Sequence, residues 1–223
     1  MAIEIRPLPA PLPAGLRESL AGIGAPTLGH YLEAGAVDPE IRALVTPAKV
    51  VGRAVTVRIT APDSVLVHKV TELIAPGDAI VIDTGGDRRH APVGGMVALA
   101  AKCGGAVCFV IDGVCTDIGE IRELGLPIFA RGTSVLTTRL LGLADGAINA
   151  PVVCGGVVVN PGDVVLADDN GVLIAAPEVV APLVARAREA EAREPATRAY
   201  LEGGGKLPAR SRANGILAQL LGG

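Results

Sequence analysis

The chain has 223 residues and a formal net charge of −3; half of its residues are apolar, but only 2% are aromatic and none is Trp. A chain of this length can form a large domain with its own core, which here must consist mainly of Val, Ile, Leu and Ala. The overall charge does not favour binding to nucleic acid or to an anionic membrane, although it leaves a local basic patch open.

No apolar run approaches the length of a membrane span, and the first residues are followed by PLPAPLP instead of the apolar stretch of a signal peptide. The four cysteines, Cys103, Cys108, Cys115 and Cys154, form no CxxC pair and stand among apolar residues. We interpret them as small core residues in a reducing compartment rather than as zinc ligands. The sequence therefore predicts a cytoplasmic protein that binds neither membrane nor nucleic acid.

The first predicted elements are helices. Residues 16–23 and 27–37 carry apolar residues at three-to-four spacing, with a break at Gly24 and Pro26. Residues 49–60 then alternate Val with polar residues, which predicts a strand.

Helical and strand patterns alternate between residues 64 and 130. They predict helices over 64–74, 96–104 and 118–124, and strands over 79–83, 106–112 and 126–130. This order is typical of parallel crossover units, so the sequence predicts an α/β fold.

The remaining part of the chain has a different pattern. Residues 147–177 predict short strands and turns, and residues 183–201 predict a charged helix that Pro195 kinks or interrupts. The last residues have the composition of a flexible or partner-dependent tail. The segment PGDAIVID (76–83) returns as PGDVVLAD (161–168), which we interpret as shared turn geometry rather than as a repeat.

Two segments are candidates for chemistry. Gly94-Gly95 precedes a predicted helix, whose free N-terminal amides would attract a carboxylate or phosphate; the alternative is a tight turn that needs glycine. Asp117, in VIDGVCTDIGEI, follows a predicted parallel strand, where α/β sheets place their ligands. It could bind a hard cation such as Mg²⁺, or it could cap the next helix together with Glu120.

The histidines give weaker signals. We expect His68 to be a packing or surface residue of its helix, whereas His30 and His90 are each either functional or simply solvated. The sequence has no serine nucleophile elbow, and none of its lysines (Lys49, Lys69, Lys102, Lys206) stands in an apolar strand that would suit a Schiff base.

Several blocks, in order, resemble the RraA-like family, which includes the regulator of ribonuclease E activity and the 4-hydroxy-4-methyl-2-oxoglutarate / 4-carboxy-4-hydroxy-2-oxoadipate aldolases. The blocks are PGDAIVIDTGG, VGGMVALAAKCGGAVCFVIDGVCTDIGEIRELGLPIFARGT and NAPVVCGGVVVNPGDVVLADDNGVLIAAP. The resemblance implies an α/β fold like the swivelling phosphohistidine domain (β/β/α) and a homotrimer or homohexamer. It predicts an N-terminal extension (1–24), an RraA-like domain (25–202) and a C-terminal tail (203–223) that is flexible or lies at a subunit interface.

The resemblance also implies a site between subunits. It assigns the Mg²⁺ or Mn²⁺ ligand of the family's DGxxRD motif to Asp117. It assigns the amides that bind a substrate carboxylate, which we call the carboxylate cradle, to Gly94, Gly95, Met96 and Val97. An acid from the neighbouring subunit's C-terminal helix would complete the outer shell of the metal, and Glu194 is the expected residue, with Glu191 as the alternative.

Two positions depart from the family pattern. Thr116 replaces the motif's Arg, and a hydroxyl cannot supply the charged, bidentate contact of a guanidinium. His30 replaces an Asp in the N-terminal helix. Arg88, Arg89 or Arg131 could supply the missing cation from nearby loops.

The predicted function is a metal-dependent carbon–carbon lyase that acts through an enolate on a 2-oxo or 2-hydroxy carboxylic acid, with a substrate altered from that of the usual aldolases. We expect Thr116, Asp117, His30 and Arg88 to act in catalysis, and Thr116 to contact the substrate with the carboxylate cradle. The alternative is a non-catalytic regulatory protein that acts through protein–protein contact.

Overall fold

The computed structural model describes residues 2–32 and 34–222. Residues 1, 33 and 223, which belong to the predicted terminal segments and to the predicted helix over 27–37, lie outside the described residues. The chain forms two compact units, Met1–Val184 and Ala185–Gly223, and each is described by itself.

The first unit is built on a mixed sheet with a parallel centre. The central strands β3 (Lys49–Ile59), β4 (Asp78–Asp83), β5 (Cys108–Asp112) and β6 (Ile128–Ala130) run parallel in this order. The helices α3 (Val65–Val70), α4 (Gly95–Cys103) and α5 (Ile118–Leu124) connect them in sequence. The predicted α/β class and crossover units are therefore confirmed.

Shorter strands extend this sheet and add a second layer. Two strands, β7 (Gly146–Ile148) and β10 (Val164–Asp168), pair antiparallel with β3. Each of them has a further neighbour: β1 (Ile3–Ile5) pairs with β7, and β11 (Gly171–Ala175) pairs with β10. At the other edge of the sheet, β2 (Arg42–Ala43) pairs with β6. The hairpin of β8 (Val152–Cys154) and β9 (Val157–Val159) is a separate two-stranded sheet.

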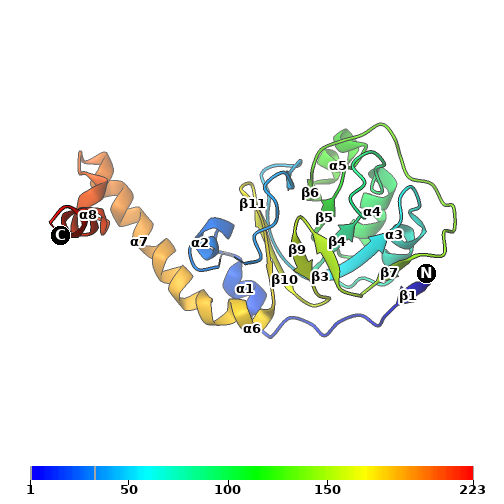
Figure 1. Ribbon diagram of the computed structural model, residues 1–223, viewed down its shortest axis with the longest axis horizontal. Coiled ribbons are helices and arrows are strands. Elements are labelled where there is room, and N and C mark those ends of the chain that lie inside the picture. Colours follow the sequence, from blue (N-terminus) through cyan, green and yellow to red (C-terminus); the bar gives the residue numbers. More distant parts are fainter. Residues whose placement is uncertain (1, 33, 223) are drawn as a thin grey trace. The chain divides into compact units, whose positions relative to one another are not determined.

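The central strands are apolar on both faces, which is why they are buried on both. Alternate residues such as Val55, Ile80 and Phe109 face the core under α3, α4 and α5. The intervening ones, such as Ala79 and Val110, face a second core that β8 to β11 complete. Figure 1 shows the three helices on one side of the central strands and β9 to β11 on the other. This β/β/α layering agrees with the predicted fold.

The N-terminal helices are shorter than predicted. α1 spans Leu16–Leu20, and α2 spans Ala25–Gly29, so the helix predicted over 27–37 is wrong beyond its first residues. The chain bends onto β11 instead, because Gly35 O accepts a hydrogen bond from Ile174 N–H and Ala36 bridges to Leu173. Gly35 has φ 94°, and a Cβ there would lie 2.3 Å from Ile174 O, so only glycine fits this close approach.

After β11 the first unit ends in α6 (Pro177–Val180) and a 3-10 turn, η1 (Ala181–Leu183). The charged helix predicted over 183–201 is confirmed as α7 (Val184–Glu202). Of the two predicted effects of Pro195, a kink or an interruption, the interruption does not occur, because the helix continues past this residue. Its many Ala, Arg and Glu residues are good helix formers, which offsets the hydrogen bond that proline removes. The tail then forms η2 (Leu207–Ala209) and α8 (Ala213–Leu221).

α8 carries four exposed apolar side chains, Ile216, Leu217, Leu220 and Leu221. Their spacing places them on one stripe of the helix. Among the described residues no helix is long and apolar enough to span a bilayer.

Candidate active site

Two aspartates end neighbouring parallel strands at the carboxyl edge of the sheet. Asp83 and Asp112 are paired in register across β4 and β5. Asp83 Oδ2 accepts a hydrogen bond from Val153 N–H (3.2 Å), and Asp112 Oδ2 accepts one from Gly155 N–H (2.7 Å). Both acids thus attach the sheet to the β8–β9 hairpin, so the first carboxylate of VIDGVCTDIGEI is structural.

Asp117 has a different environment. It occupies the N-cap position of α5 with φ 52° and ψ 37°, and in the described chain no side-chain hydrogen bond caps this helix. Its Oδ2 instead accepts a hydrogen bond from Gly95 N–H (3.0 Å), the first residue of α4. The left-handed backbone directs the carboxylate across to the neighbouring helix, so the interpretation that Asp117 and Glu120 cap α5 is wrong.

A side chain at either of the two glycines that start α4 would meet neighbouring side chains. A Cβ on Gly94 would lie 2.5 Å from Asp117 Oδ2 and 3.0 Å from Thr116 Cγ2, and a Cβ on Gly95 would lie 1.8 Å from Glu120 Oε2. Thr116, Asp117 and Glu120 therefore converge on these glycines. The predicted Gly94, Gly95, Thr116 and Asp117 lie together, and Glu120 is a further neighbour that sequence reasoning interpreted only as a cap.

The other half of the carboxylate cradle consists of Met96 and Val97. Ala98 N–H donates to Gly94 O (2.9 Å), so the amides of Met96 and Val97 precede the first intrahelical bond and have no acceptor in their own helix. The positive end of the helix dipole adds to their attraction for an anion. Met96 is exposed and Val97 is partly buried against the core.

The donor set at Asp117 fits a hard cation. The part of the chain that the structure describes contains no group of three or more His, Cys, Asp and Glu residues suited to a metal, so an ion here would take most of its ligands from water or substrate. Mg²⁺ is bound in this way, through one or two carboxylates with several waters. From the described residues, the second oxygen of Asp117, Oδ1, receives only a long hydrogen bond from Thr116 Oγ1 (3.3 Å), which leaves it available to an ion.

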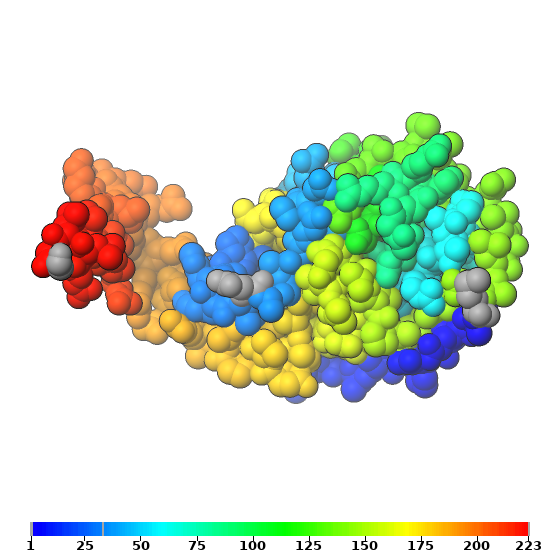
Figure 2. All heavy atoms as spheres, viewed as in Figure 1, coloured from blue at the N-terminus to red at the C-terminus, as the bar shows by residue number. Residues whose placement is uncertain are grey.

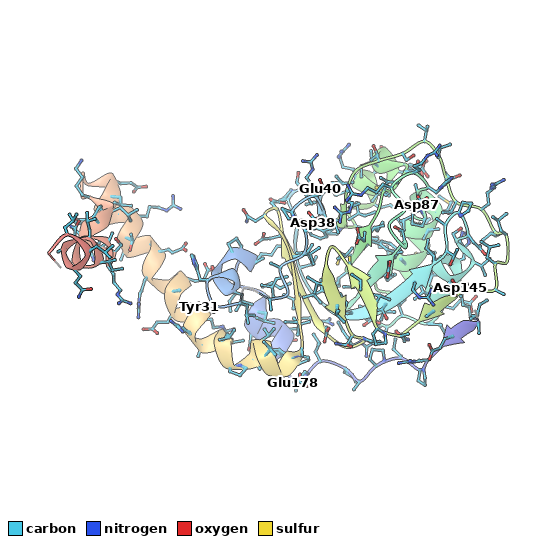
Figure 3. The ribbon with its side chains drawn as sticks, viewed as in Figure 1. Tyr31, Asp38, Glu40, Asp87, Asp145 and Glu178 are labelled. Atoms are coloured by element: carbon cyan, nitrogen blue, oxygen red, sulfur yellow. The ribbon has the colours of Figure 1, made fainter. Side chains whose placement is uncertain are left out.

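Two of the arginines considered as replacement cations are paired with acids. Arg131 donates through Nε to Asp112 Oδ1 (2.7 Å) and through one terminal nitrogen to Asp38 Oδ2 (2.9 Å) and Glu40 Oε2 (2.8 Å). Arg88 also donates to Glu40 Oε2 (2.9 Å). Figure 3 shows Asp38 and Glu40 close together above the sheet. Sequence reasoning did not predict this network.

The pKa values in the network follow from its contacts. Burial opposes the charge of Arg131, but hydrogen bonds to Asp112 and Asp38 outweigh it and raise the pKa of the guanidinium. The Glu40 N–H and then the Arg131 guanidinium lower the pKa of Asp38. Arg131 therefore remains charged and paired.

His90 and Arg89 lie in the loop that precedes α4. Asp87 accepts hydrogen bonds from Arg89 N–H (2.9 Å), His90 N–H (2.7 Å) and His90 Nδ1 (3.0 Å). Desolvation alone would raise the pKa of Asp87, but the hydrogen bonds from His90 and Arg89 outweigh it and lower this pKa. His90 thus contacts the acid of its own loop.

Other predicted residues lie elsewhere. His30 follows α2, which packs on β10 and β11, whereas α4 packs on α5, so within one chain His30 is not brought to Asp117. His68 is exposed on α3. Glu194 and Glu191 belong to α7 in the second unit.

Three of the four cysteines, Cys108, Cys115 and Cys154, are buried as predicted, but Cys103 is exposed at the end of α4. Burial raises the pKa of the Cys115 thiol to about 11.

The β/β/α layering and the Asp117 carboxylate at the start of α4 define a class of α/β protein with an acid beside a helix N-terminus. The family model described as "Aldolase/RraA" (RraA-like) matches residues 25–174. The chain belongs to the RraA-like family, as predicted.

Relatives within this family carry two kinds of name. A protein of Halalkalibacterium halodurans named "Putative 4-hydroxy-4-methyl-2-oxoglutarate aldolase" is 41% identical over 126 residues, which are 56% of this chain and only 59% of that protein. The RNA-processing inhibitor RraA from Thermus thermophilis is 30% identical, with a TM-score of 0.61 over 67% of this chain and 90% of that one. Streptomyces coelicolor RraAS2, described as an unusual member of the RNase ES inhibitor RraA family, is 28% identical, with a TM-score of 0.72 over 85% and 99%.

Proposed function

We propose that this protein is a divalent-metal-dependent carbon–carbon lyase that acts on a 2-oxo or 2-hydroxy carboxylic acid through an enolate. The observation that supports this most is the position of the Asp117 carboxylate. It lies at the start of α4 beside two glycines, where an added Cβ would meet the carboxylates of Asp117 and Glu120, and its second oxygen is available. The aldolase names of relatives support the same class.

Each residue has a role in this proposal. The amides of Met96 and Val97 bind the substrate carboxylate at the positive end of α4. Asp117 holds Mg²⁺ or Mn²⁺, which supplies Lewis-acid stabilisation of the charge that develops on the 2-oxo oxygen. Thr116 orients Asp117 through its hydroxyl, and Glu120 Oε2, beside Gly95, accepts the substrate's hydroxyl proton.

The bond changes balance without a further reactant. Loss of the proton from the substrate's C4 hydroxyl forms a new carbonyl at C4 as the C3–C4 bond breaks. The electron pair of that bond moves to C3 and is delocalised onto the 2-oxo oxygen as an enolate. A proton then returns to C3 and releases the shorter 2-oxo acid.

The proposal also covers the substrate and the assembly. Thr116 in place of Arg implies a substrate different from that of the relatives. The assembly we propose is a homotrimer or homohexamer in which Glu194 approaches the site of a neighbouring subunit.

The test follows the enolate directly. Exchange of the pyruvate methyl protons with deuterated water, measured by NMR, needs only enolate formation and no knowledge of the natural substrate. We expect Mg²⁺- or Mn²⁺-dependent exchange that EDTA abolishes, together with calorimetric binding of Mn²⁺. Release of pyruvate from oxaloacetate is a second readout through the same enolate. Absence of chelator-sensitive turnover on every 2-oxo acid tested, with no metal binding, would contradict the proposal.

A second candidate is a regulatory protein that acts by docking to a partner protein. The observation that favours it is the neutral Thr116, together with solved relatives described as inhibitors of RNA processing. This candidate predicts that Asp117 serves only as a cap for α4. Calorimetry would then show no binding of Mn²⁺ or of pyruvate to the wild-type protein.

A further inference from the structure

The charges at the start of α4 do not balance for an anionic substrate. Asp117 and Glu120 both place carboxylates against the two glycines, and Thr116 is neutral. A 2-oxo acid would bring another negative charge to the same place. The helix end and one divalent ion offset part of this charge, but a further cation would favour binding of the substrate.

The nearby cations with partners do not meet this need. Arg131 is only 8% exposed and contacts the carboxylates of Asp38, Glu40 and Asp112, so moving its guanidinium to a substrate would break three ion pairs. Arg88 is paired with Glu40. Lys102, near the other end of α4, donates to Leu124 O.

Arg89 differs from these residues. Its side chain is exposed, and within residues 2–32 and 34–222 no carboxylate lies within ion-pair distance of its guanidinium. Its backbone, by contrast, is held at both ends. Its N–H donates to Asp87 Oδ1 (2.9 Å), and its carbonyl accepts from Ser134 Oγ (2.6 Å). The Cα is therefore fixed while the charged group remains available.

Backbone contacts connect the Arg89 segment with Thr116. Ser134, which binds the Arg89 carbonyl, donates its own N–H to Cys115 O (2.9 Å). Thr116 N–H donates to Val93 O (2.9 Å). Residues 89–93 are thus attached at both ends to the segment that contains Thr116 and Asp117.

We propose that Arg89 is the substrate-binding cation of this site, and that it supplies from the loop before α4 the guanidinium that position 116 lacks. This inference rests on the proposed function and extends it. It assigns to Arg89 the role predicted for Arg88, whose charge is matched by Glu40. The ligand class is a 2-oxo acid whose carboxylate or enolate oxygens accept hydrogen bonds from two N–H groups of the Arg89 guanidinium.

The experiment compares Arg89→Ala and Arg89→Lys with Arg122→Ala, a matched control. Arg122 is an exposed arginine of α5 that, in the described part of the chain, also has no ion pair. Calorimetric binding of pyruvate in the presence of Mg²⁺ is the first readout, and methyl-proton exchange the second. We expect Arg89→Ala to weaken binding by roughly ten- to a hundred-fold, the effect of losing a charge-assisted hydrogen bond.

Further variants separate a contact from a structural effect. Arg89→Lys keeps the positive charge but loses the bidentate hydrogen bonding, so it should retain part of the affinity for pyruvate. Thr116→Arg added to Arg89→Ala should restore part of the lost binding, and thermal melting should show that each variant is folded. Arg122→Ala should bind pyruvate as the wild type does.

The outcomes distinguish the two proposals. If the wild type exchanges pyruvate protons and Arg89→Ala does so equally well with unchanged affinity, only the role of Arg89 is wrong. The same conclusion follows if Arg122→Ala loses as much affinity as Arg89→Ala. If the wild type neither binds nor exchanges pyruvate, the proposed function and the role of Arg89 both fail.

Discussion

Asp117 combines an uncommon backbone with an uncommon contact. Its φ of 52° places it in the left-handed region, which Asp tolerates better than most residues, and its Oδ2 caps α4 rather than α5. Asp117→Asn keeps the shape and an acceptor oxygen for Gly95 N–H but removes the charge. We expect loss of Mn²⁺ binding and of pyruvate exchange, with a change in unfolding free energy below about 1 kcal/mol.

Calorimetry and urea unfolding check this pair of results. If Asp117→Asn binds Mn²⁺ like the wild type, the carboxylate is only a helix cap. A large loss of stability would likewise assign Asp117 a structural role.

The two glycines of the carboxylate cradle give a second prediction at this scale. Alanine at Gly94 would place its Cβ 2.5 Å from Asp117 Oδ2 and would displace the carboxylate from Gly95 N–H. We expect Gly94→Ala to remove metal-dependent exchange and to destabilise the fold by about 1–3 kcal/mol. Gly119→Ala in α5 is the control, because its Cβ meets nothing within 4 Å.

Alanine is the better helix former, so the control should be neutral or stabilising by up to about 1 kcal/mol. Thermal melting and the exchange assay measure both variants. Equal activity of Gly94→Ala and Gly119→Ala would show that the close approach at Gly94 is unimportant.

At the scale of elements, the two PGD turns share a geometry but not an electrostatic environment. In each, the aspartate accepts a hydrogen bond from the N–H three residues earlier: Asp78 Oδ2 from Ala75 (2.7 Å) and Asp163 Oδ2 from Asn160 (2.8 Å). Gly77 and Gly162 have φ 92° and 95°. The interpretation of shared turn geometry is thereby confirmed. Asp78, however, is also paired with buried Arg53 (2.8 Å).

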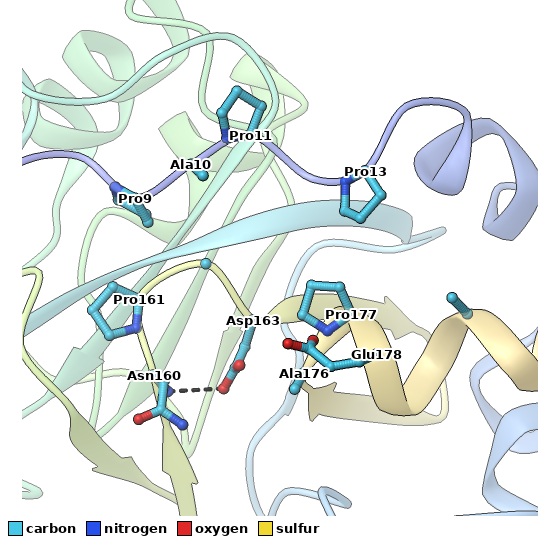
Figure 4. A pocket seen from close by; sticks show the side chains of 12 residues that line it. Pro9, Ala10, Pro11, Pro13, Asn160, Pro161, Asp163, Ala176, Pro177 and Glu178 are labelled. Carbon is cyan, nitrogen blue, oxygen red and sulfur yellow. Dashed lines mark hydrogen bonds between the residues drawn. The ribbon is translucent and has the colours of Figure 1, made fainter.

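Asp163 instead lies in a pocket of about 630 Å³ between the N-terminal prolines and α6, near Glu178 (Figure 4). Burial raises the pKa of Asp163, and the negative charge of Glu178 raises it further. The hydrogen bond from Asn160 N–H lowers this pKa but does not outweigh the burial. Because the folded pKa of Asp163 lies above the ordinary aspartate pKa of 3.8, the wild type loses stability as pH rises from that value through the folded pKa.

Asp163→Asn should therefore gain stability relative to the wild type over this pH range. Urea unfolding of both proteins between about pH 3 and about pH 7 measures the difference. Asp78→Asn is the control, and we expect it to lose stability relative to the wild type, whereas Asp163→Asn gains it. It leaves Arg53 buried without its counter-charge and should cost about 3–5 kcal/mol near neutral pH. A wild type that gains stability relative to Asp163→Asn as pH rises would contradict the assignment.

The elements themselves were largely predictable, because their patterns are local. The alternation along β3 and the apolar runs of β4 and β5 are visible in the sequence without any partner. Contacts between distant segments were not. The end of α2 at Gly29 depends on pairing with β11, and the cap that Asp117 supplies to α4 depends on a backbone angle. The acids of Arg131 lie up to 93 residues away, and no spacing rule connects them.

On the scale of the whole molecule, charge and exposed apolar surface are unevenly distributed. Residues 185–223 contain seven Lys and Arg against four Glu, a formal charge of +3, which leaves −6 on residues 1–184 out of the total of −3. Exposed apolar residues of the first unit include Val135 and Leu140 of the connection 131–145, which runs around its outer edge (Figures 1 and 2). Opposite charges and apolar patches on two units favour association between copies of the chain.

The stripe of α8 allows a direct test of this association. The buried residues of the two core clusters lie within residues 45–148 and 37–174. Among the described residues, η2 and α8 contain no buried residue. Removal of residues 206–223 should therefore shift the melting temperature by less than about 4 °C. We expect the truncated chain to form a smaller assembly in light scattering, because the exposed side chains of Ile216, Leu217, Leu220 and Leu221 are lost.

Leu217→Gln combined with Leu221→Gln should likewise give a smaller assembly in the full-length chain, because both leucines belong to the stripe. Glutamine keeps the helix propensity of these positions and removes their apolar surface. Gln219→Ala, in the same helix, is the matched control and should leave the assembly unchanged. An unchanged mass for both the truncated chain and the double variant would show that the copies associate through the first unit alone, and the connection 131–145 would then be the next surface to substitute.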